Sequence, residues 1–313
     1  MPNRNVLISI VLAILLSSAS AFPQGPIRDR IQQRREARQA GEQTPGQRAL
    51  EERAASRPQE RQEIAGLNVA IWKPSRAEGK APLIIFSHGY LGCNDATTFL
   101  MQRFAEAGYI VFAPNHRDAL CGPVANRDLR PQQGFMNTGA WNERTYADRR
   151  DDIKNLLNAL RQNAEWNSQI DWSRIGLVGH SLGGYTVLGL AGAWPAWKIP
   201  NVKAVLALAP YCEPYAVKGT LAGVRVPVMY LTGNRDPVTL TVKRAGGCFD
   251  KTPSPSVFVE FATTGHLSFT DLPSASHELI DEYSVAFFDK YVRGVGGRNL
   301  AAKQSGVLAL KVK

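Results

Sequence analysis

One pentapeptide, Gly179-His180-Ser181-Leu182-Gly183, constrains the fold of this chain more than any other stretch. Ile175–Val178 before it is an apolar, β-branched run typical of a buried strand, and Tyr185–Ala191 after it has the apolar spacing of a helix. A Gly-x-Ser-x-Gly sequence between a strand and a helix forms a sharp turn that exposes the serine at the top of a sheet. Ser181 is therefore a candidate nucleophile, and the Leu182 amide at the helix start is a candidate oxyanion donor.

The N-terminal part of the chain differs from the rest in composition. Met1–Ala21 combines a basic start at Arg4, an apolar run from Val6 to Leu16 and the small residues Ala19-Ser20-Ala21. This pattern predicts a secretory signal peptide, because the apolar run is too short to cross a bilayer comfortably. An uncleaved membrane anchor is the alternative.

Residues 22–63 are rich in Gln, Arg, Glu and Ala and contain almost no large apolar side chains. Such a segment has too little apolar surface to form a core, so we expect a disordered or loosely helical tether. Order is expected from near Gly66, with residues 64–295 forming one catalytic domain and residues 296–313 a C-terminal tail.

The formal net charge of +10 does not by itself indicate a nucleic-acid partner. The arginines are scattered and often stand beside acidic residues, and the sequence has no basic stripe interleaved with aromatic residues. We therefore interpret the charge as a solvated surface. We expect no nucleic-acid binding and no stable membrane insertion once the signal peptide is removed.

Four cysteines, Cys93, Cys121, Cys212 and Cys248, lie in the part of the chain that would be exported. Their spacing does not match that of metal ligands, whereas an oxidising compartment permits disulfides. Each cysteine follows a predicted strand, so all four should lie at one edge of the sheet. We predict that sequence neighbours pair, Cys93 with Cys121 and Cys212 with Cys248, and free buried thiols are the alternative.

A second informative stretch follows the apolar run Leu83–Phe86, which is typical of a central parallel strand. The run leads into Ser87–Gly92, and the loop at this place supplies the other backbone donor of an oxyanion hole when a Gly-x-Ser-x-Gly turn is present. The Tyr90 amide is the candidate donor. His88 is interpreted as a histidine that bonds the loop rather than as a base, because it precedes the serine.

The turn-rich segment Pro114–Thr145 is long for a compact domain, and loops of this length are often functional. It should lie over the edge of the sheet that carries Ser181. There Phe135, Met136 and Trp141 either line an acyl pocket or simply pack within the loop.

Tyr146–Leu160 is predicted to be a helix because Ile153, Leu156 and Leu160 lie on one apolar face. The charges at its start are interpreted as surface and loop-pairing groups rather than as catalysts: Asp148, Arg149, Arg150, Asp151 and Asp152. The remaining predicted elements are helices over 96–107 and 276–291 and strands over 67–72, 109–113, 204–208, 226–232 and 257–261.

Two further loops carry candidate partners for Ser181. Asp236 stands just beyond a predicted strand and before Pro237, where the acid of a catalytic triad is expected; Asp250 is the alternative. His266 follows the strand that we predict to be the last of the sheet, and its loop can place the imidazole over the serine turn. The chain order Ser181, Asp236, His266 differs from that of the two main serine-protease folds.

With these parts in place, the chain resembles the α/β-hydrolase superfamily over Leu67 to about Val292, and is similar to its dienelactone hydrolase and platelet-activating-factor acetylhydrolase branch. The residues that carry the resemblance are Phe86-Ser87-His88-Gly89, Gly179–Tyr185, Ala204–Pro210 and Gly265–Asp271. It implies an α/β fold with a mostly parallel central sheet flanked by helices on both faces. It also implies a Ser-His-Asp carboxylesterase that needs no metal and no organic cofactor.

The chain departs from this branch at two positions. Dienelactone hydrolases proper carry Cys as the nucleophile where this chain has Ser181, and acetylhydrolases usually have Leu where Tyr90 stands. We predict a secreted or periplasmic serine esterase acting on small-molecule esters, either short-chain acyl or phospholipid-type. One alternative is a cutinase-like hydrolase of polyesters or lipids, in which the Tyr90 ring flanks the scissile ester. A non-catalytic binding protein is disfavoured, because no expected catalytic position is replaced.

Overall fold

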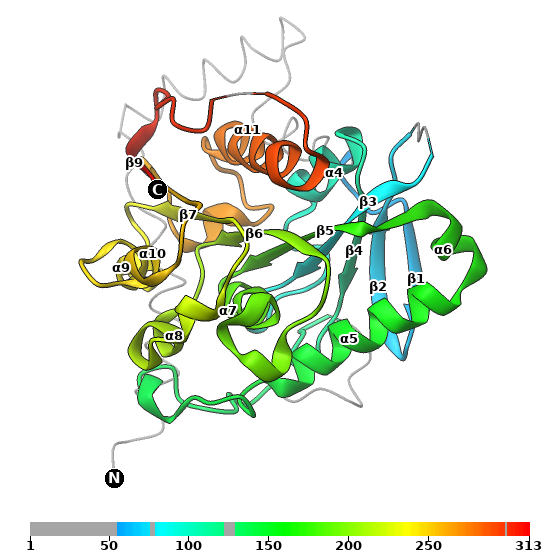
Figure 1. The fold of residues 1–313 in the computed structure, drawn as a ribbon, viewed down its shortest axis with the longest axis horizontal. Coiled ribbons are helices and arrows are strands. Elements are labelled where there is room, and N and C mark those ends of the chain that lie inside the picture. Colours follow the sequence, from blue (N-terminus) through cyan, green and yellow to red (C-terminus); the bar gives the residue numbers. More distant parts are fainter. Residues whose placement is uncertain (1–54, 76–78, 122–128, 298) are drawn as a thin grey trace, which may run out of the picture. The chain divides into compact units, whose positions relative to one another are not determined.

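The structure, a computed structural model, describes residues 55–75, 79–121, 129–297 and 299–313. A nine-stranded sheet forms the centre of this part of the chain (Figure 1). The strand order is β1-β2-β4-β3-β5-β6-β7-β8-β9. Neighbours from β4 to β8 run parallel, whereas β1, β2 and β9 add antiparallel pairs at the two edges. The bounds are β1 Glu60–Ile64, β2 Leu67–Trp72, β3 Ala81–Ser87, β4 Ile110–Pro114, β5 Ile170–His180, β6 Val202–Leu208, β7 Val228–Gly233, β8 Ser256–Phe261 and β9 Val307–Val312.

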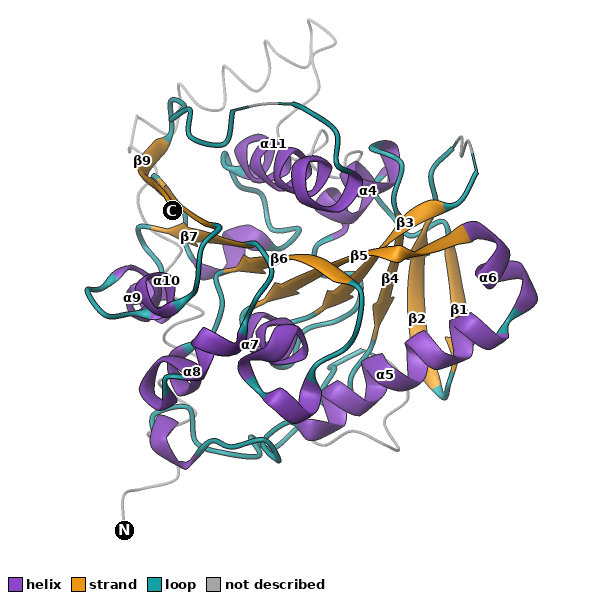
Figure 2. Cartoon of the chain, in the orientation of Figure 1, coloured by secondary structure: helices purple, strands orange, loops and turns teal. Residues whose placement is uncertain are grey.

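Helices cover both faces of this sheet (Figure 2). The central strands are apolar throughout because both of their faces are buried: in β3, Leu83 and Ile85 face one core while Ile84 and Phe86 face the other. Helices α4 and α11 pack on the second face, and α5, α7 and α8 on the first. The helix bounds are α4 Thr98–Glu106, α5 Ala147–Gln162, α6 Ala164–Gln169, α7 Leu182–Leu188, α8 Glu213–Lys218, α9 Leu240–Lys243, α10 Cys248–Lys251 and α11 His277–Phe288.

This architecture is the α/β-hydrolase arrangement predicted from the sequence, and the expected elements are present with ends that shift by a few residues. Where the structure describes the chain, it has no helix of the length and apolarity needed to cross a membrane. The predicted signal peptide and residues 22–54 of the predicted tether lie outside the described residues.

The limits predicted for the domain are too narrow at both ends. Residues 60–63 fall within the predicted tether, but Glu60–Ile64 forms β1 and pairs antiparallel with β2. Val307–Val312 was assigned to the tail, but it forms β9 and pairs with β8, so β8 is not the last strand. Both are edge strands with one solvated face, and backbone pairing orders them even where the composition is polar.

Two strands at the middle of the sheet position the candidate site. The chain passes from β3 outward to β4 and then returns to place β5 on the other side of β3. The loops that follow β3 and β5 therefore diverge from neighbouring strands, and this topological switch point is where open α/β sheets form their binding crevice. Ser181 follows β5, and the loop formed by residues 88–92 follows β3.

Two disulfides join loops beyond the carboxyl ends of the parallel strands. Cys93 pairs with Cys121, with 5.8 Å between their Cα atoms, and Cys212 pairs with Cys248, with 6.3 Å between theirs. These distances are ordinary for a disulfide. The pairing is the one predicted from the sequence.

Candidate active site

Ser181 occupies a tight turn between β5 and α7. Its φ of 54° and ψ of −114° are outside the regions that L-residues normally adopt, which is typical of a nucleophile held at a sharp strand-to-helix turn. A Cβ on Gly179 would overlap the Gly183 carbonyl, and one on Gly183 would overlap the Ser87 carbonyl. The flanking glycines are thus required for the close approach of β5, α7 and the loop after β3.

The three side chains predicted to act together do meet in the structure. The Ser181 Oγ lies 2.9 Å from Nε2 of His266, and Nδ1 of His266 lies 2.8 Å from Oδ2 of Asp236. An Nδ1–H that donates to the carboxylate leaves Nε2 as the acceptor that faces the serine hydroxyl. The geometry is that of a nucleophile, a base and an orienting acid.

The loops that carry Asp236 and His266 are fixed against each other. A Cβ on Gly233, the last residue of β7, would overlap the Thr264 carbonyl, and the Arg235 N–H donates to the same carbonyl at 3.0 Å. The other carboxylate oxygen of Asp236 accepts the Val238 N–H at 2.9 Å, so the buried carboxylate has a partner at each oxygen. The acid and the imidazole are therefore held in register by backbone contacts.

His180, which precedes the nucleophile, adds a restraint that the sequence did not reveal. Its Nε2 lies 3.1 Å from the backbone carbonyl of His266, to which it donates a hydrogen bond. Burial and the neighbouring His266 ring lower the pKa of His180 to about 3, so the imidazole is neutral. His180 thus links the serine turn directly to the histidine loop.

The alternative acid, Asp250, is not brought to His266. Its carboxylate accepts the Gly246 N–H at 2.8 Å. His277, at the start of α11, is half-buried: its ring stacks on Phe99 at 3.9 Å between centroids, and its Nε2 donates a hydrogen bond to the Thr270 carbonyl.

The segment after His266 has a structural task. Phe269 is buried, and the carboxylate of Asp271 accepts hydrogen bonds from the Thr98 hydroxyl at 2.7 Å and the Phe99 N–H at 3.2 Å. Asp271 thereby caps the start of α4, where free backbone N–H groups and the helix dipole favour a negative charge. This contact anchors the histidine loop to the helical layer.

The loop after β3 lies against the nucleophile, as the oxyanion-hole prediction requires. A Cβ on Gly89 would lie 3.3 Å from Cβ of Ser181 and 3.2 Å from Nδ1 of His180. Tyr90 follows this point of contact, and Leu182 is the first residue of α7, so its amide stands at a helix N-terminus. Both predicted donors therefore belong to segments that border Ser181.

His88 is a buried loop histidine, as predicted. Its Nδ1 lies 2.7 Å from the Gly89 carbonyl, and its Nε2 accepts the His116 N–H at 3.0 Å. Burial and the charge of Arg149 lower the pKa of His88 well below its usual value, which keeps the imidazole neutral. Both ring nitrogens are used within the loop.

The structure corrects the interpretation of Arg149 as a surface charge. Its side chain is fully buried beneath the loop after β3, where it forms a bidentate ion pair with Asp118 at 2.7 and 2.9 Å. It does pair with loops, as expected, because it also donates to the carbonyls of His88 and Gly89. The sequence held one sign of this burial: Arg149 lies four residues before Ile153, on the apolar face of α5.

A second Ser-His-Asp chain lies beside this ion pair and was not predicted. Ser87 Oγ is 2.9 Å from Nε2 of His116, and Nδ1 of His116 is 2.8 Å from the carboxylate of Asp152. Ser87 and His116 are buried, and Ser87 is the last residue of a regular strand rather than part of an exposed turn. This arrangement braces the loop and offers no access to a substrate.

Aromatic side chains border the serine turn. Tyr90 and Tyr211 each contact Phe135, with ring centroids 5.3 and 5.2 Å apart, and all three side chains are partly exposed. The Tyr211 N–H donates to the Ser181 carbonyl at 2.9 Å, which places this group next to the nucleophile. Trp141 is buried behind Phe135, so of the three residues expected to line a pocket only Phe135 is placed to do so; Met136 is 98% exposed.

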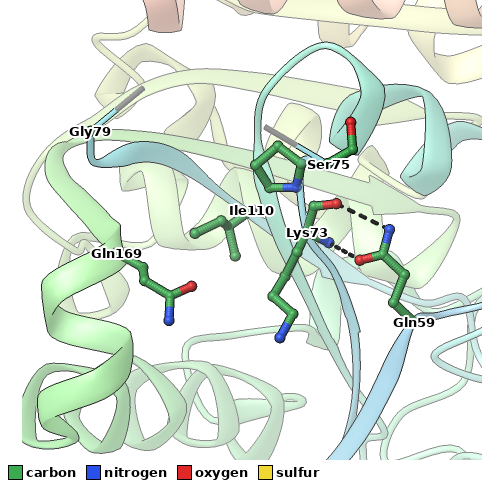
Figure 3. A pocket seen from close by; sticks show the side chains of 7 residues that line it. Gln59, Lys73, Ser75, Gly79, Ile110 and Gln169 are labelled. Atoms are coloured by element: carbon green, nitrogen blue, oxygen red, sulfur yellow. Dashed lines mark hydrogen bonds between the residues drawn. The ribbon is translucent and has the colours of Figure 1, made fainter. Parts of the chain in front are cut away.

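A surface pocket lies elsewhere, at the edge of the sheet where β4 and β5 begin (Figure 3). Gln59 and Lys73 stand on one side, joined by two hydrogen bonds at 2.8 and 3.0 Å, and Ile110 and Gln169 on the other. None of the candidate catalytic side chains lines it. Ser181 follows the opposite end of β5.

Comparison with known proteins identifies relatives named as cutinases and as a terephthalate ester hydrolase. Cutinase 2 of Thermobifida cellulosilytica is 24% identical over 212 residues, 67% of this chain and 68% of the cutinase. Cutinase cut1 of Thermobifida fusca is 24% identical over 212 residues but is covered for only 56% of its length. A bis(hydroxyethyl) terephthalate hydrolase of Streptomyces coelicolor is 20% identical over 229 residues, with 62% of its length covered.

A sequence profile of the dienelactone hydrolase family matches residues 67–247, more than half of the chain. The matched region runs from β2 to the loop before α10 and includes the serine turn, the loop after β3 and Asp236. The chain therefore belongs to the dienelactone hydrolase family of the α/β-hydrolase superfamily.

Proposed function

We propose that this protein is a serine carboxylesterase in which Ser181, His266 and Asp236 form the catalytic triad. The observation that carries the proposal is the continuous chain of hydrogen bonds from the Ser181 hydroxyl through His266 to Asp236, at a strained turn facing the switch point of the sheet. Relatives named as cutinases and as a bis(hydroxyethyl) terephthalate hydrolase support ester chemistry.

The mechanism follows from the roles of these groups. His266 takes the proton of Ser181 as the hydroxyl attacks the ester carbonyl, and Asp236 holds the imidazole tautomer and stabilises the imidazolium that forms. The amides of Tyr90 and Leu182 hold the oxyanion. Removing one such donor typically raises the barrier by about 3 kcal/mol, so these amides are a major part of catalysis. The imidazolium then gives its proton to the departing alcohol as the ester C–O bond breaks, which leaves the acyl group on Ser181. Water deprotonated by His266 attacks this acyl-enzyme, and the acid is released as the proton returns to Ser181.

Export fits the cysteine chemistry. Both disulfides occur in the described part of the chain, and disulfides persist in oxidising compartments. We therefore propose a periplasmic or extracellular location, which agrees with the signal-peptide pattern of residues 1–21.

Two classes of ester are candidate substrates, and the aromatic side chains beside Ser181 favour one of them. Short-chain or phospholipid-type esters were the first expectation. The partly exposed rings of Tyr90, Phe135 and Tyr211 beside Ser181 favour the alternative, a polyester or cutin-like substrate whose flat or bulky groups can stack on them. The names of the cutinase relatives point in the same direction.

Labelling with a fluorophosphonate probe tests the proposed nucleophile. The Ser181→Ala variant should lose both labelling and ester hydrolysis. Ser87→Ala should still be labelled, because Ser87 is buried whereas Ser181 is partly exposed at its turn. The Ser181 variant should unfold at nearly the wild-type temperature, since only a hydroxyl is removed. Ester hydrolysis by Ser181→Ala above about a hundredth of the wild-type rate would exclude the assignment.

A matched set of substrates tests the ester class. We expect the mature protein to hydrolyse bis(hydroxyethyl) terephthalate and short p-nitrophenyl esters, and the Tyr211→Ala variant to raise KM for the terephthalate ester more than for p-nitrophenyl acetate. A preference for phospholipid esters over both would return the assignment to the acetylhydrolase type of substrate.

A further inference from the structure

The guanidinium of Arg149 makes an unusually complete set of contacts beneath the loop after β3. It donates to the His88 carbonyl at 2.6 Å and to the Gly89 carbonyl at 3.2 Å, and a longer contact of 3.5 Å reaches Ser87 Oγ. Its remaining N–H groups bind the Asp118 carboxylate. A fork of five donors in fixed geometry is thus used to hold the last residue of β3 and the first two residues of the loop that follows it.

The Gly89 carbonyl is the part of this set that bears on catalysis. Besides Arg149 it accepts the Gly92 N–H at 3.0 Å and the hydrogen of His88 Nδ1 at 2.7 Å. The same peptide group carries the N–H of Tyr90. Because a trans peptide is planar, its N–H points opposite to its carbonyl, so the three donors direct the Tyr90 N–H away from the buried guanidinium.

The charge of Arg149 also strengthens the Tyr90 N–H as a hydrogen-bond donor. A cationic hydrogen bond to a carbonyl polarises the peptide, and hydrogen-bonded groups in a low-dielectric interior strengthen one another. The ion pair with Asp118 makes this buried charge tolerable. Burial opposes ionisation of Asp118, but the adjacent guanidinium holds the pKa of that carboxyl below its usual value.

We propose that Arg149 is a positioning residue for the oxyanion hole, acting through the Gly89–Tyr90 peptide to orient and polarise the Tyr90 N–H. This inference rests on the proposed esterase function and adds to it a buried residue that never touches the substrate. Asp118 holds the guanidinium in place. The Ser87, His116 and Asp152 chain supports the start of the same loop.

Two variants separate this role from a purely structural one. The Arg149→Met/Asp118→Leu double variant removes the ion pair without leaving one buried charge unpaired. Arg149→Lys keeps a positive charge but loses the planar fork that spans both carbonyls and the carboxylate. Arg150→Met is the matched control, because Arg150 is the next residue of α5 and pairs with Asp151 at the surface.

The measurement compares p-nitrophenyl acetate with the thionoester in which sulfur replaces the carbonyl oxygen. An oxyanion hole built for oxygen discriminates against sulfur, so the ratio of kcat for the oxygen and sulfur substrates reports its integrity. Rates are divided by the fraction of protein that an active-site titrant labels at completion. This correction removes any loss due to unfolded protein.

We expect the double variant to lower kcat for the oxygen ester by about a hundredfold, with KM changed by less than about threefold. The ratio of kcat for the oxygen ester to kcat for the sulfur ester should fall by about tenfold or more, because the oxyanion hole stabilises the sulfur ester's transition state only weakly even in the wild type. Arg149→Lys should show a smaller fall of the same kind. Arg150→Met should match the wild type in both quantities.

An unchanged ratio in Arg149→Lys and in the double variant would overturn the inference, even if kcat fell, because a structural role lowers both rates alike. If the double variant does not fold, the Arg149→Lys ratio decides. The two failures are distinguishable. A wild-type protein without esterase activity, or an active Ser181→Ala variant, would refute the triad and with it the inference that rests on it, whereas an unchanged ratio in an active enzyme would refute only the role of Arg149.

Discussion

The two disulfides close loops of similar length but should differ in what they do for the site. Cys93 stands three residues after Tyr90, and its partner Cys121 stands three residues after Asp118, which holds Arg149. The second bridge joins Cys212, before α8, to Cys248 in α10. Replacing either pair with alanine therefore removes a comparable restraint, and only the first replacement frees the candidate oxyanion loop.

The loss of stability can be worked out from the sequence separations of 28 and 36 residues. The chain-entropy relation assigns about 3.6 kcal/mol to the first bridge and about 3.8 kcal/mol to the second, both upper values. Cys212 and Cys248 are also buried, so their removal leaves a small cavity and adds to the second figure. Each double variant should therefore unfold roughly 10 °C below the wild type.

The activities of the two variants should diverge. In the Cys93→Ala/Cys121→Ala variant, the Asn94 N–H can still donate to Asn115, and Arg149 can still pair with Asp118. The candidate oxyanion loop should therefore become more mobile without losing its position. We expect kcat of Cys93→Ala/Cys121→Ala to fall by about tenfold at 25 °C, and that of Cys212→Ala/Cys248→Ala to change by less than about twofold. Calorimetry and p-nitrophenyl ester kinetics measure both effects. Equal losses of kcat, or no loss of stability in either variant, would refute the reasoning.

Three further predictions concern single groups. Asp236→Asn should lower kcat for ester hydrolysis by about 10⁴-fold, because the amide favours the wrong imidazole tautomer, and a larger loss in Asp250→Asn would place the acid elsewhere. His266→Ala should abolish esterase activity, whereas His88→Ala should chiefly lower the unfolding temperature; the reverse pattern would exchange their roles. Burial raises the pKa of Asp281 to about 8, so its folded form binds a proton more tightly than the unfolded chain does, and stability should fall as pH rises from about 4 to about 8. Unfolding temperatures recorded across this range should decline less in Asp281→Asn than in the wild type, and parallel curves would contradict this source of pH dependence.

The sequence determined the parts of the site that depend on short stretches of chain. The apolar run of β5, the glycines around Ser181 and the apolar face of α7 specify a strand, a sharp turn and a helix by local sterics and periodicity. Asp236 and His266 each follow a strand that could be recognised in the same way. Because parallel strands end at one edge of a sheet, these local elements also predicted that the three side chains would meet.

Only the tertiary structure decided which polar residues are buried and which segments complete the sheet. Arg149 stands in a charged run, and its burial depends on Asp118, 31 residues earlier, and on carbonyls some 60 residues earlier. β1 and β9 look like tether and tail because edge strands gain order from backbone pairing with a distant partner rather than from apolar composition. The local sequence pattern determines which segments form helices and strands. Which polar side chains are buried, and which edge strands pair, depends on groups that the fold brings together from distant parts of the chain.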